Sequence, residues 1–202
     1  MHPNPAFRNT PAEQNLAFAR ERGFGILSAN GTDGPVLAHV PFLLSQDGTF
    51  ADLHLARSNG LVRATGAAVL AVSGPDAFIS PDWYGLPDQV PTWNYVAVHL
   101  RGELRALPPE ALEPHLNEIS DRFEAGLLPK PIWKTSKMGE GVMERMMRMI
   151  LPFRLIIHSV DGTWKLNQNK PTAARRGAIV ALTALGGMSA DLAQLMAAVP
   201  ED

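Results

Sequence analysis

The spacing of apolar residues along the chain changes several times, and each change marks an expected element. Residues 10–22 are expected to form a helix, because Thr10, Pro11 and Glu13 supply the cap, the first-turn proline and the capping-box acid of a helix start. From residue 24 the spacing becomes that of strands, with short apolar or alternating runs between turn-forming residues. Strands are expected at residues 24–29, 36–44, 49–56, 67–73, 77–80, 93–106, 153–160 and 163–166.

Three features of these strands indicate how they are arranged. Pro41 has no backbone N–H to donate, so its strand is expected to lie at a sheet edge or to bulge there. Asp161-Gly162 separates the last two strands and is a two-residue hairpin signal. The strand over residues 93–106 alternates, so one face is expected to meet the core and the other a polar or aromatic environment.

Helical spacing returns in later parts of the chain. Residues 108–123 carry an apolar stripe at helical spacing. It consists of Leu112, Leu116, Ile119 and Phe123. A methionine-rich helix is expected at residues 142–151 and a helical pair at about 172–199. Strands and helices do not alternate strictly, which disfavours a doubly wound parallel sheet. We therefore expect one α+β domain over residues 1–202, mainly an antiparallel barrel with flanking helices.

The composition narrows the classes of protein. The 202 residues include no cysteine, which excludes disulfides, thiolate zinc sites, iron–sulfur clusters and a cysteine nucleophile. Residues 1–7 lack the pattern of a secretory signal, and no apolar run reaches the ~18 residues that span a membrane. A soluble, cytoplasmic protein without a membrane partner is therefore expected.

The charge is unevenly distributed, although the net charge is only -2. Residues 1–129 contain no lysine, so an anion bound there must be held by arginine, histidine, hydroxyl or backbone N–H groups. Residues 130–176, here called the basic segment, carry ten lysines and arginines against three acids, a local charge of +7. Any contact with DNA is expected from this segment.

The most informative local motif is His54-Leu55-Ala56-Arg57-Ser58-Asn59, which joins a strand to a short helix expected at residues 60–65. The start of a helix offers free N–H groups to an anion, and Arg57 adds a forked donor suited to phosphate. The alternative is that Ser58 or Asn59 merely caps the helix and that Arg57 is solvated.

Two further segments have a functional and a structural interpretation. Both tyrosines and two of the four tryptophans lie within residues 79–95, which suits a flat ligand, a subunit interface or simple packing of a loop. Residues 165–171, Lys-Leu-Asn-Gln-Asn-Lys-Pro, combine two cations with three amides. This segment either clamps an anion or is a polar connection between a strand and a helix.

Other familiar sites are not indicated. His39, His54 and His99 lie on separate expected strands, without the spacing of a metal site. There is no phosphate-binding glycine loop, nucleophile elbow or acid–base pair, so no catalytic residue is assigned. The second helix of the C-terminal pair offers only Asp191 and Gln194 as polar side chains of any reach, which argues against DNA reading by that helix.

Taken in order, these pieces resemble the PaiB-type family of FMN-binding negative transcriptional regulators. The matching segments are MHPNPAF at 1–7, HVP at 39–41, HLARSN at 54–59, SGPDAFISPDWY at 73–84, VPTWNYVAVHLRG at 90–102 and KLNQNKP at 165–171. They span nearly the whole chain. His2 departs from the tyrosine of many relatives, and Asn167 from a pattern closer to Lys-Leu-Ser-Gln-Asn.

The resemblance implies a single FMN-binding split-barrel domain that forms a homodimer with FMN at the subunit interface. Arg57, Ser58 and Asn59 would then hold the phosphate, and His39 and His54 would approach the phosphate or the flavin edge. Trp93, Asn94 and Tyr95 would line the rest of the site. Two alternatives remain: an FMN-dependent oxidoreductase of the flavin reductase or pyridoxine phosphate oxidase type, and a protein that contacts DNA directly through the basic segment.

Overall fold

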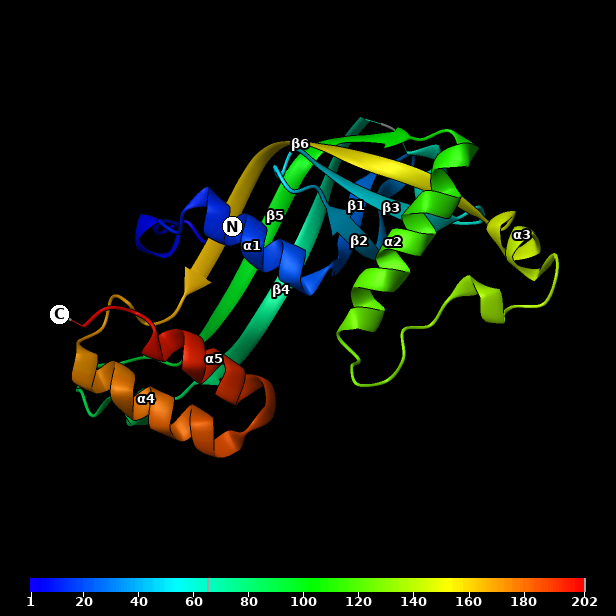
Figure 1. The fold of residues 1–202 in the computed structure, drawn as a ribbon. Helices are drawn as coiled ribbons and strands as arrows, with labels where there is room; N and C mark the ends of the chain where they lie inside the picture. The colour runs from blue at the N-terminus through cyan, green and yellow to red at the C-terminus, as the bar shows by residue number, and fades with distance from the viewer. Residues whose placement is uncertain (65, 202) are drawn as a thin grey trace. The chain divides into compact units, whose positions relative to one another are not determined.

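Six strands form a closed barrel in the order β1-β2-β3-β6-β5-β4 (Figure 1). The computed structural model describes residues 1–64 and 66–201. The strands are β1 Phe24–Gly31, β2 Gly34–Leu44, β3 Phe50–Ala56, β4 Gly66–Ile79, β5 Thr92–Ala106 and β6 Ile150–Lys165. The pairs β1–β2, β1–β4, β2–β3 and β3–β6 are antiparallel. The mainly antiparallel barrel with flanking helices is confirmed.

The helices lie between and after these strands. The α-helices of the described residues are α1 Ala12–Arg22, α2 Leu112–Ala125, α3 Val142–Met147, α4 Thr172–Leu185 and α5 Gly187–Ala197. Short 3-10 helices are η1 Pro5–Phe7, η2 Gly60–Arg63, η3 Pro81–Tyr84, η4 Pro109–Ala111 and η5 Thr135–Lys137. The expected end of the short helix at Thr65 lies outside the described residues. None of the helices among residues 1–64 and 66–201 has the length and apolar character needed to cross a membrane.

Backbone contacts divide the chain into two compact units. The barrel unit consists of Leu16–Ala71 and His99–Val160. The terminal unit consists of Met1–Asn15, Val72–Val98 and Asp161–Asp202. Strands β4, β5 and β6 contribute residues to both units. That the chain forms a single domain stays a prediction.

In the barrel unit the period-two pattern builds the core. Leu53 of β3 lies opposite Phe42 of β2 on one side and Phe153 of β6 on the other, and all three side chains are buried. The intervening residues of β3 point outward, where Asp52 accepts two hydrogen bonds from Arg154, with Oδ1–Nε and Oδ2–Nη2 distances of 2.6 and 2.7 Å. The alternation therefore separates an apolar interior from a polar exterior.

Three strand predictions need correction. The strands expected at residues 67–73 and 77–80 are one continuous strand, β4. The ring is closed, so β2 is not an edge strand; instead, Pro41 lies where β2 passes from pairing with β1 to pairing with β3. The hairpin at Asp161-Gly162 is wrong, because β6 runs through both residues. Gly162 serves close packing: a Cβ atom there would lie 2.1 Å from Oδ1 of Asn15, which accepts a 2.7 Å hydrogen bond from Trp164.

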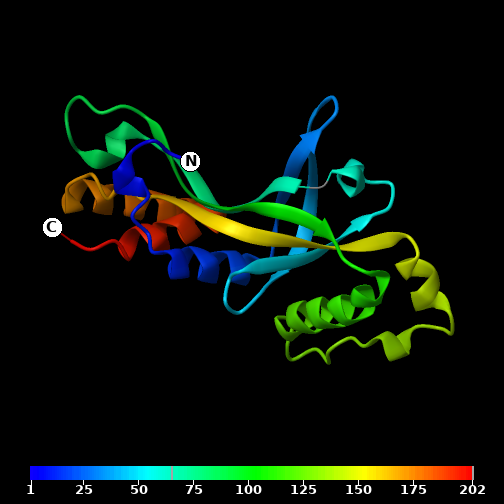
Figure 2. The ribbon, with the colours of Figure 1, turned by 90° about the horizontal axis from the view of Figure 1, so that it is seen from above.

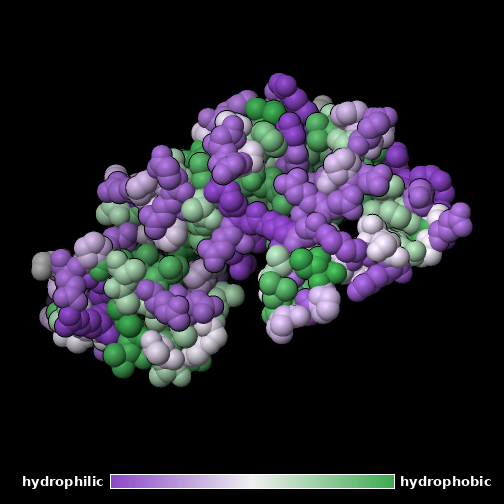
Figure 3. Space-filling view, in the orientation of Figure 1, coloured by the Kyte–Doolittle hydropathy of each residue, from purple (hydrophilic) through white to green (hydrophobic). Residues whose placement is uncertain are grey.

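The terminal unit contains the helical pair α4–α5, whose two helices lie side by side (Figure 1). Leu182 and Leu192 are fully buried between them and their neighbours. The buried Arg175 donates to the backbone oxygens of Val199 and Pro200, which attaches the end of the chain to α4. Hydrophobic residues also reach the surface over this pair (Figure 3).

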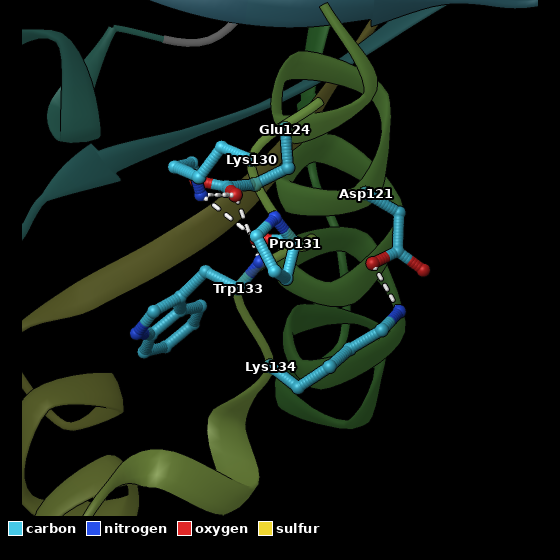
Figure 4. A network of polar contacts seen from close by, with 6 residues as sticks. All are labelled: Asp121, Glu124, Lys130, Pro131, Trp133 and Lys134. Carbon is cyan, nitrogen blue, oxygen red and sulfur yellow. Dashed lines mark hydrogen bonds and ion pairs between the residues drawn. The ribbon is translucent and has the colours of Figure 1, made fainter. Parts of the chain in front are cut away.

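In the barrel unit, a long segment joins α2 to α3 (Figure 2). Lys130 of this segment pairs with Glu124 of α2, and Lys134 lies 2.5 Å from Oδ1 of Asp121 (Figure 4). Glu124 also accepts a 2.8 Å hydrogen bond from the backbone N–H of Trp133. These hydrogen bonds lower the pKa of Glu124 and keep the carboxylate charged. Two cations of the basic segment are thereby neutralised by acids that lie outside it.

Candidate functional site

The candidate anion site begins where β3 ends. The backbone N–H of Arg57 donates to the oxygen of Met149 at 2.9 Å, and its side-chain Nε donates to the oxygen of Arg148 at 2.6 Å. These two bonds fix the base of the side chain against the chain between α3 and β6. Within the described residues, the two terminal amino groups of the exposed Arg57 donate to no protein acceptor. They form a fork that is free to bind an anion.

The next two residues have different roles. Asn59 caps η2, because its side-chain oxygen accepts a 2.9 Å hydrogen bond from the N–H of Leu61. Ser58 is exposed, and its hydroxyl forms no hydrogen bond with the described residues. The capping alternative therefore applies to Asn59, whereas Arg57 and Ser58 keep donors available. One segment thus presents two adjacent side chains suited to a phosphate.

Two pockets in the barrel unit border this segment. The turn pocket, about 330 Å³, lies between the β1–β2 turn and η2, where Gly60 and Arg63 meet Thr32 and Asp33. The α2 pocket, about 340 Å³, is lined by Arg57 and extends to α2 and α3. Its acids are Glu110, Glu113 and Glu144. The α2 pocket sets these three carboxylates against two guanidinium groups, Arg57 and Arg148, whereas the turn pocket sets one carboxylate, Asp33, against Arg63. The turn pocket therefore repels a phosphate less.

A third pocket continues from the turn pocket. The strand pocket, about 340 Å³, shares the lining residues Asn30 and Pro35 with the turn pocket. It also contains Ser28, Arg101 and His158. The two adjoining pockets fall in the size range of ligand sites and carry hydroxyl, amide and cationic groups. Arg63 lines the turn pocket, and Arg57 and Ser58 precede Gly60 of the same pocket in the chain without lining it. These three residues are the donors near the turn pocket that suit a phosphorylated ligand.

His54 lies on the outer face of β3, against α2. Its Nδ1 is 3.1 Å from Nε2 of His115, a buried residue of α2. Burial lowers the pKa of His54, and it lowers that of His115 to about 4, with His54 adding repulsion. Both rings are therefore neutral at pH 7, and one donates a hydrogen bond to the other. The pair joins α2 to the barrel.

His115 was missed by the sequence analysis, although a signal was present. It lies three residues after Leu112 and four before Ile119, which places it on the same buried helix face. Phe123, by contrast, is 40% exposed, although it belongs to the predicted apolar stripe.

His39 is exposed on β2 and stacks on Phe24, with ring centres 6.4 Å apart. Roles for His39 and His54 near a flavin stay predictions.

Trp93, Asn94 and Tyr95 belong to the terminal unit, whereas the other predicted site residues belong to the barrel unit. Their side chains alternate along β5. Trp93 is 55% exposed and meets Phe78 edge to face, with ring centres 6.1 Å apart. Asn94 is fully buried and its Nδ2 lies 3.6 Å from the sulfur of Met196. Tyr95 is half-buried. Their contact with a ligand stays a prediction.

The described part of the chain contains no group of three or more His, Asp or Glu side chains arranged to hold a metal. The guanidinium and hydroxyl groups of Arg57, Ser58 and Arg63 are suited to binding an anion.

Comparison with known proteins gives a family and a fold. Residues 1–159 match a family model described as "Putative FMN-binding domain". The chain is 28% identical over 169 residues to protease synthase and sporulation protein PAI 2 (PaiB) of Bacillus subtilis, covering 81% of this chain and 80% of that protein.

Two solved structures share the fold. The flavocytochrome Anf3 of Azotobacter vinelandii matches with a TM-score of 0.60 and 15% identity, over 81% of this chain and 72% of that one. An FAD and haem binding protein of Mycobacterium smegmatis matches with a TM-score of 0.58 and 16% identity, over 79% and 73%. With the closed ring of six strands, these likenesses confirm the expected split barrel.

Proposed function

Since the chain belongs to the family of FMN-binding domains that its residues 1–159 match, we propose that it binds FMN with the phosphate at Arg57 and Ser58. FMN is the cofactor that this membership assigns. The resemblance to the PaiB-type family, noted from the sequence motifs, is confirmed by the same match and by the relative in Bacillus subtilis.

The free fork of Arg57 is the observation that carries the proposal. A bound phosphate carries close to two negative charges and needs donors that point to one place. Arg57 supplies two free amino groups, Ser58 supplies a hydroxyl, and Arg63 adds a second guanidinium at the turn pocket. Charge-assisted hydrogen bonds of this kind are shorter and stronger than neutral ones.

The adjoining pockets give the remainder of the cofactor a place to bind. The turn pocket and the strand pocket together offer Thr32, Ser28 and Asn30 to polar edges and Val36 and Ala68 to apolar ones. When bound, FMN supplies redox chemistry through its ring system. The protein residues bind and orient the cofactor and exclude water from part of its surface.

Titration of FMN with the purified protein tests the proposal. We expect saturable quenching of flavin fluorescence at micromolar concentrations, with weaker binding of riboflavin because riboflavin lacks the phosphate. Absence of saturable binding of FMN would contradict the proposal.

Addition of NAD(P)H to the FMN-loaded protein distinguishes an enzyme from a binding protein. Bleaching of the flavin absorption supports an FMN-dependent oxidoreductase, and an unchanged spectrum supports a binding protein.

We also propose that the protein is a homodimer. The terminal unit exposes a pair of aromatic rings, Phe78 and Trp93, at 48% and 55%. Apolar side chains that are contiguous on a surface mark interaction sites, and these two rings are in contact. Sedimentation equilibrium should give a mass near twice the 21.9 kDa of one chain. The variant Trp93→Ser should dissociate more readily into single chains. If the wild-type protein sediments with the mass of a single chain, the proposal is contradicted.

The regulatory role that the PaiB-type resemblance implies stays a prediction. The basic segment has less free charge than its sequence indicates. Lys130 and Lys134 pair with acids of α2, Arg154 pairs with Asp52, and Arg176 pairs with Glu201. Each of these four acids lies outside the basic segment. Contacts with DNA would therefore rest on a smaller set of cations, which includes Lys137 and Arg145.

A further inference from the structure

The terminal unit contains a pair of lysines that the proposed flavin site does not use. Lys165 ends β6 and Lys170 follows it in the turn before α4. The ammonium group of Lys165 donates to the hydroxyl of Thr92, and that of Lys170 donates to the side-chain oxygen of Gln89. Both lysines are half-buried, so neither ammonium group is fully solvated. Both partners are neutral.

Neither charge is compensated by a carboxylate of the part of the chain that the structure describes. Among the described residues, no acid lies within ion-pair distance of either lysine. Asp82 and Asp88 of the neighbouring loop are exposed and pair with neither. Burial lowers the pKa of Lys165, and the positive charge of Lys170 lowers it further. Two like charges are thus held near one another in a partly dehydrated place, where an added anion is stabilised.

The turn between the lysines is fixed by its own amides. Gln168 accepts a 2.7 Å hydrogen bond from the N–H of Leu166 and donates a 2.6 Å bond to the oxygen of Trp164. Asn167 adopts a left-handed backbone conformation with a φ of 61°. Its backbone oxygen accepts a 3.0 Å hydrogen bond from the backbone N–H of Lys170. The two lysines therefore start from a fixed backbone, which reduces the entropy that a ligand must remove.

A buried amide and a buried aromatic ring complete the cluster. The ammonium nitrogen of Lys170 lies 5.1 Å from the centre of the Tyr84 ring, and the Tyr84 hydroxyl donates to Oδ1 of Asn167 at 3.3 Å. Asn167 is only 2% exposed, and its Nδ2 has no hydrogen-bond partner. A buried donor without a hydrogen-bond partner destabilises the folded protein. The unpaired Nδ2 therefore indicates that a bound ligand supplies the missing acceptor.

We propose that Lys165 and Lys170, with the Asn167 amide beside them, form a binding site for a small anion that carries a phosphate or carboxylate group. The anion replaces Thr92 and Gln89 as the acceptor of one or both ammonium groups. This site consists only of residues of the terminal unit and does not depend on the Arg57 segment. It assigns a function to residues 165–171, for which the sequence allowed an anion clamp but favoured a polar connection between a strand and a helix.

Nuclear magnetic resonance of protein with carbon-13-labelled lysine, titrated with inorganic phosphate, tests this proposal directly. The Cε signals of Lys165 and Lys170 are assigned with the variants Lys165→Arg and Lys170→Arg. We expect both signals to shift saturably at millimolar phosphate or below, and the pKa of Lys165 to rise when the anion is bound. The absence of a saturable shift at these lysines up to about 50 mM phosphate would overturn the proposal.

Calorimetry on matched variants gives the affinity. In the background of Arg57→Ala, which removes the main donor of the flavin site, Lys165→Met and Lys170→Met should each weaken phosphate binding about 10- to 100-fold. Lys137→Met, at an exposed lysine of η5, should leave binding unchanged. Equal effects of the three variants would contradict a specific site. Melting temperatures confirm that each variant is folded.

Competition with the flavin identifies the source of the anion. If FMN displaces phosphate from the two lysines and riboflavin does not, the anion is the phosphate of the cofactor itself. If phosphate remains bound in the protein saturated with FMN, the site takes a separate ligand. Both results support the anion site, and the first would contradict the placement of the FMN phosphate at Arg57 and Ser58. Loss of FMN binding by itself does not contradict phosphate binding at the two lysines.

Discussion

Replacement of Arg57 by alanine should lower the affinity for FMN by about 10- to 100-fold and leave the affinity for riboflavin almost unchanged. The variant removes the fork that faces the phosphate, whereas the ring system binds elsewhere. A charge-assisted hydrogen bond contributes about 1.5–3 kcal/mol, which corresponds to this loss. Arg57→Lys should recover part of the affinity, since it restores the charge without the fork.

The measurement is a pair of fluorescence titrations, one with FMN and one with riboflavin. Arg145→Ala is the matched control, because Arg145 is an exposed arginine of the same unit that lies outside residues 54–59 and lines none of the turn, strand and α2 pockets. Arg57 also holds the oxygen of Arg148, so its removal is expected to cost about 1 kcal/mol of stability. If the Arg57→Ala variant loses affinity for FMN and for riboflavin equally, the proposal that Arg57 binds the phosphate is contradicted.

Replacement of Gly102 by alanine should destabilise the protein by more than about 4 kcal/mol. Gly102 lies in β5, and a Cβ atom there would lie 1.7 Å from the backbone oxygen of Ile156 in β6. Backbone atoms cannot rotate away as a side chain can, so the two strands would have to separate. That separation breaks the ring of hydrogen bonds of the barrel and disturbs the packing behind it.

Urea unfolding compares this variant with Gly139→Ala. A Cβ atom at Gly139 would lie 3.7 Å from the nearest atom, a methyl carbon of Val142, which is ordinary contact. The control should therefore shift the free energy of unfolding by less than about 1 kcal/mol. A Gly102 variant as stable as this control would show that β5 and β6 do not approach as closely as described.

The strand pattern was readable from the sequence wherever one face of a strand is buried. The alternation in residues 36–44 and 93–106 follows directly from the period of a strand, and the structure has strands there. The prediction from the sequence was wrong where packing requires a residue that is also typical of turns. Asp161-Gly162 has the composition of a hairpin, yet the close approach of Asn15 requires a glycine inside a continuous strand.

Part of the candidate site could be predicted from the sequence for a similar reason. The motif at residues 54–59 indicated an anion site because the end of a strand and the start of a short helix follow one another in the chain. Which of its side chains remain free was not readable. Asn59 is occupied as a cap, and His54 lies against His115, a residue sixty-one positions away. Such partners depend on contacts that no local pattern records.

By itself the sequence determined the class of fold, the family and the segment that offers donors to a phosphate. These properties rest on period, composition and contiguous motifs, which are local. Only the tertiary structure decided which charges are free. The local +7 of residues 130–176 is reduced by Asp52, Asp121, Glu124 and Glu201, which come from other parts of the chain. Lys165 and Lys170, in contrast, have no acidic partner within residues 1–64 and 66–201, because charge compensation depends on distance in space rather than on position in the sequence.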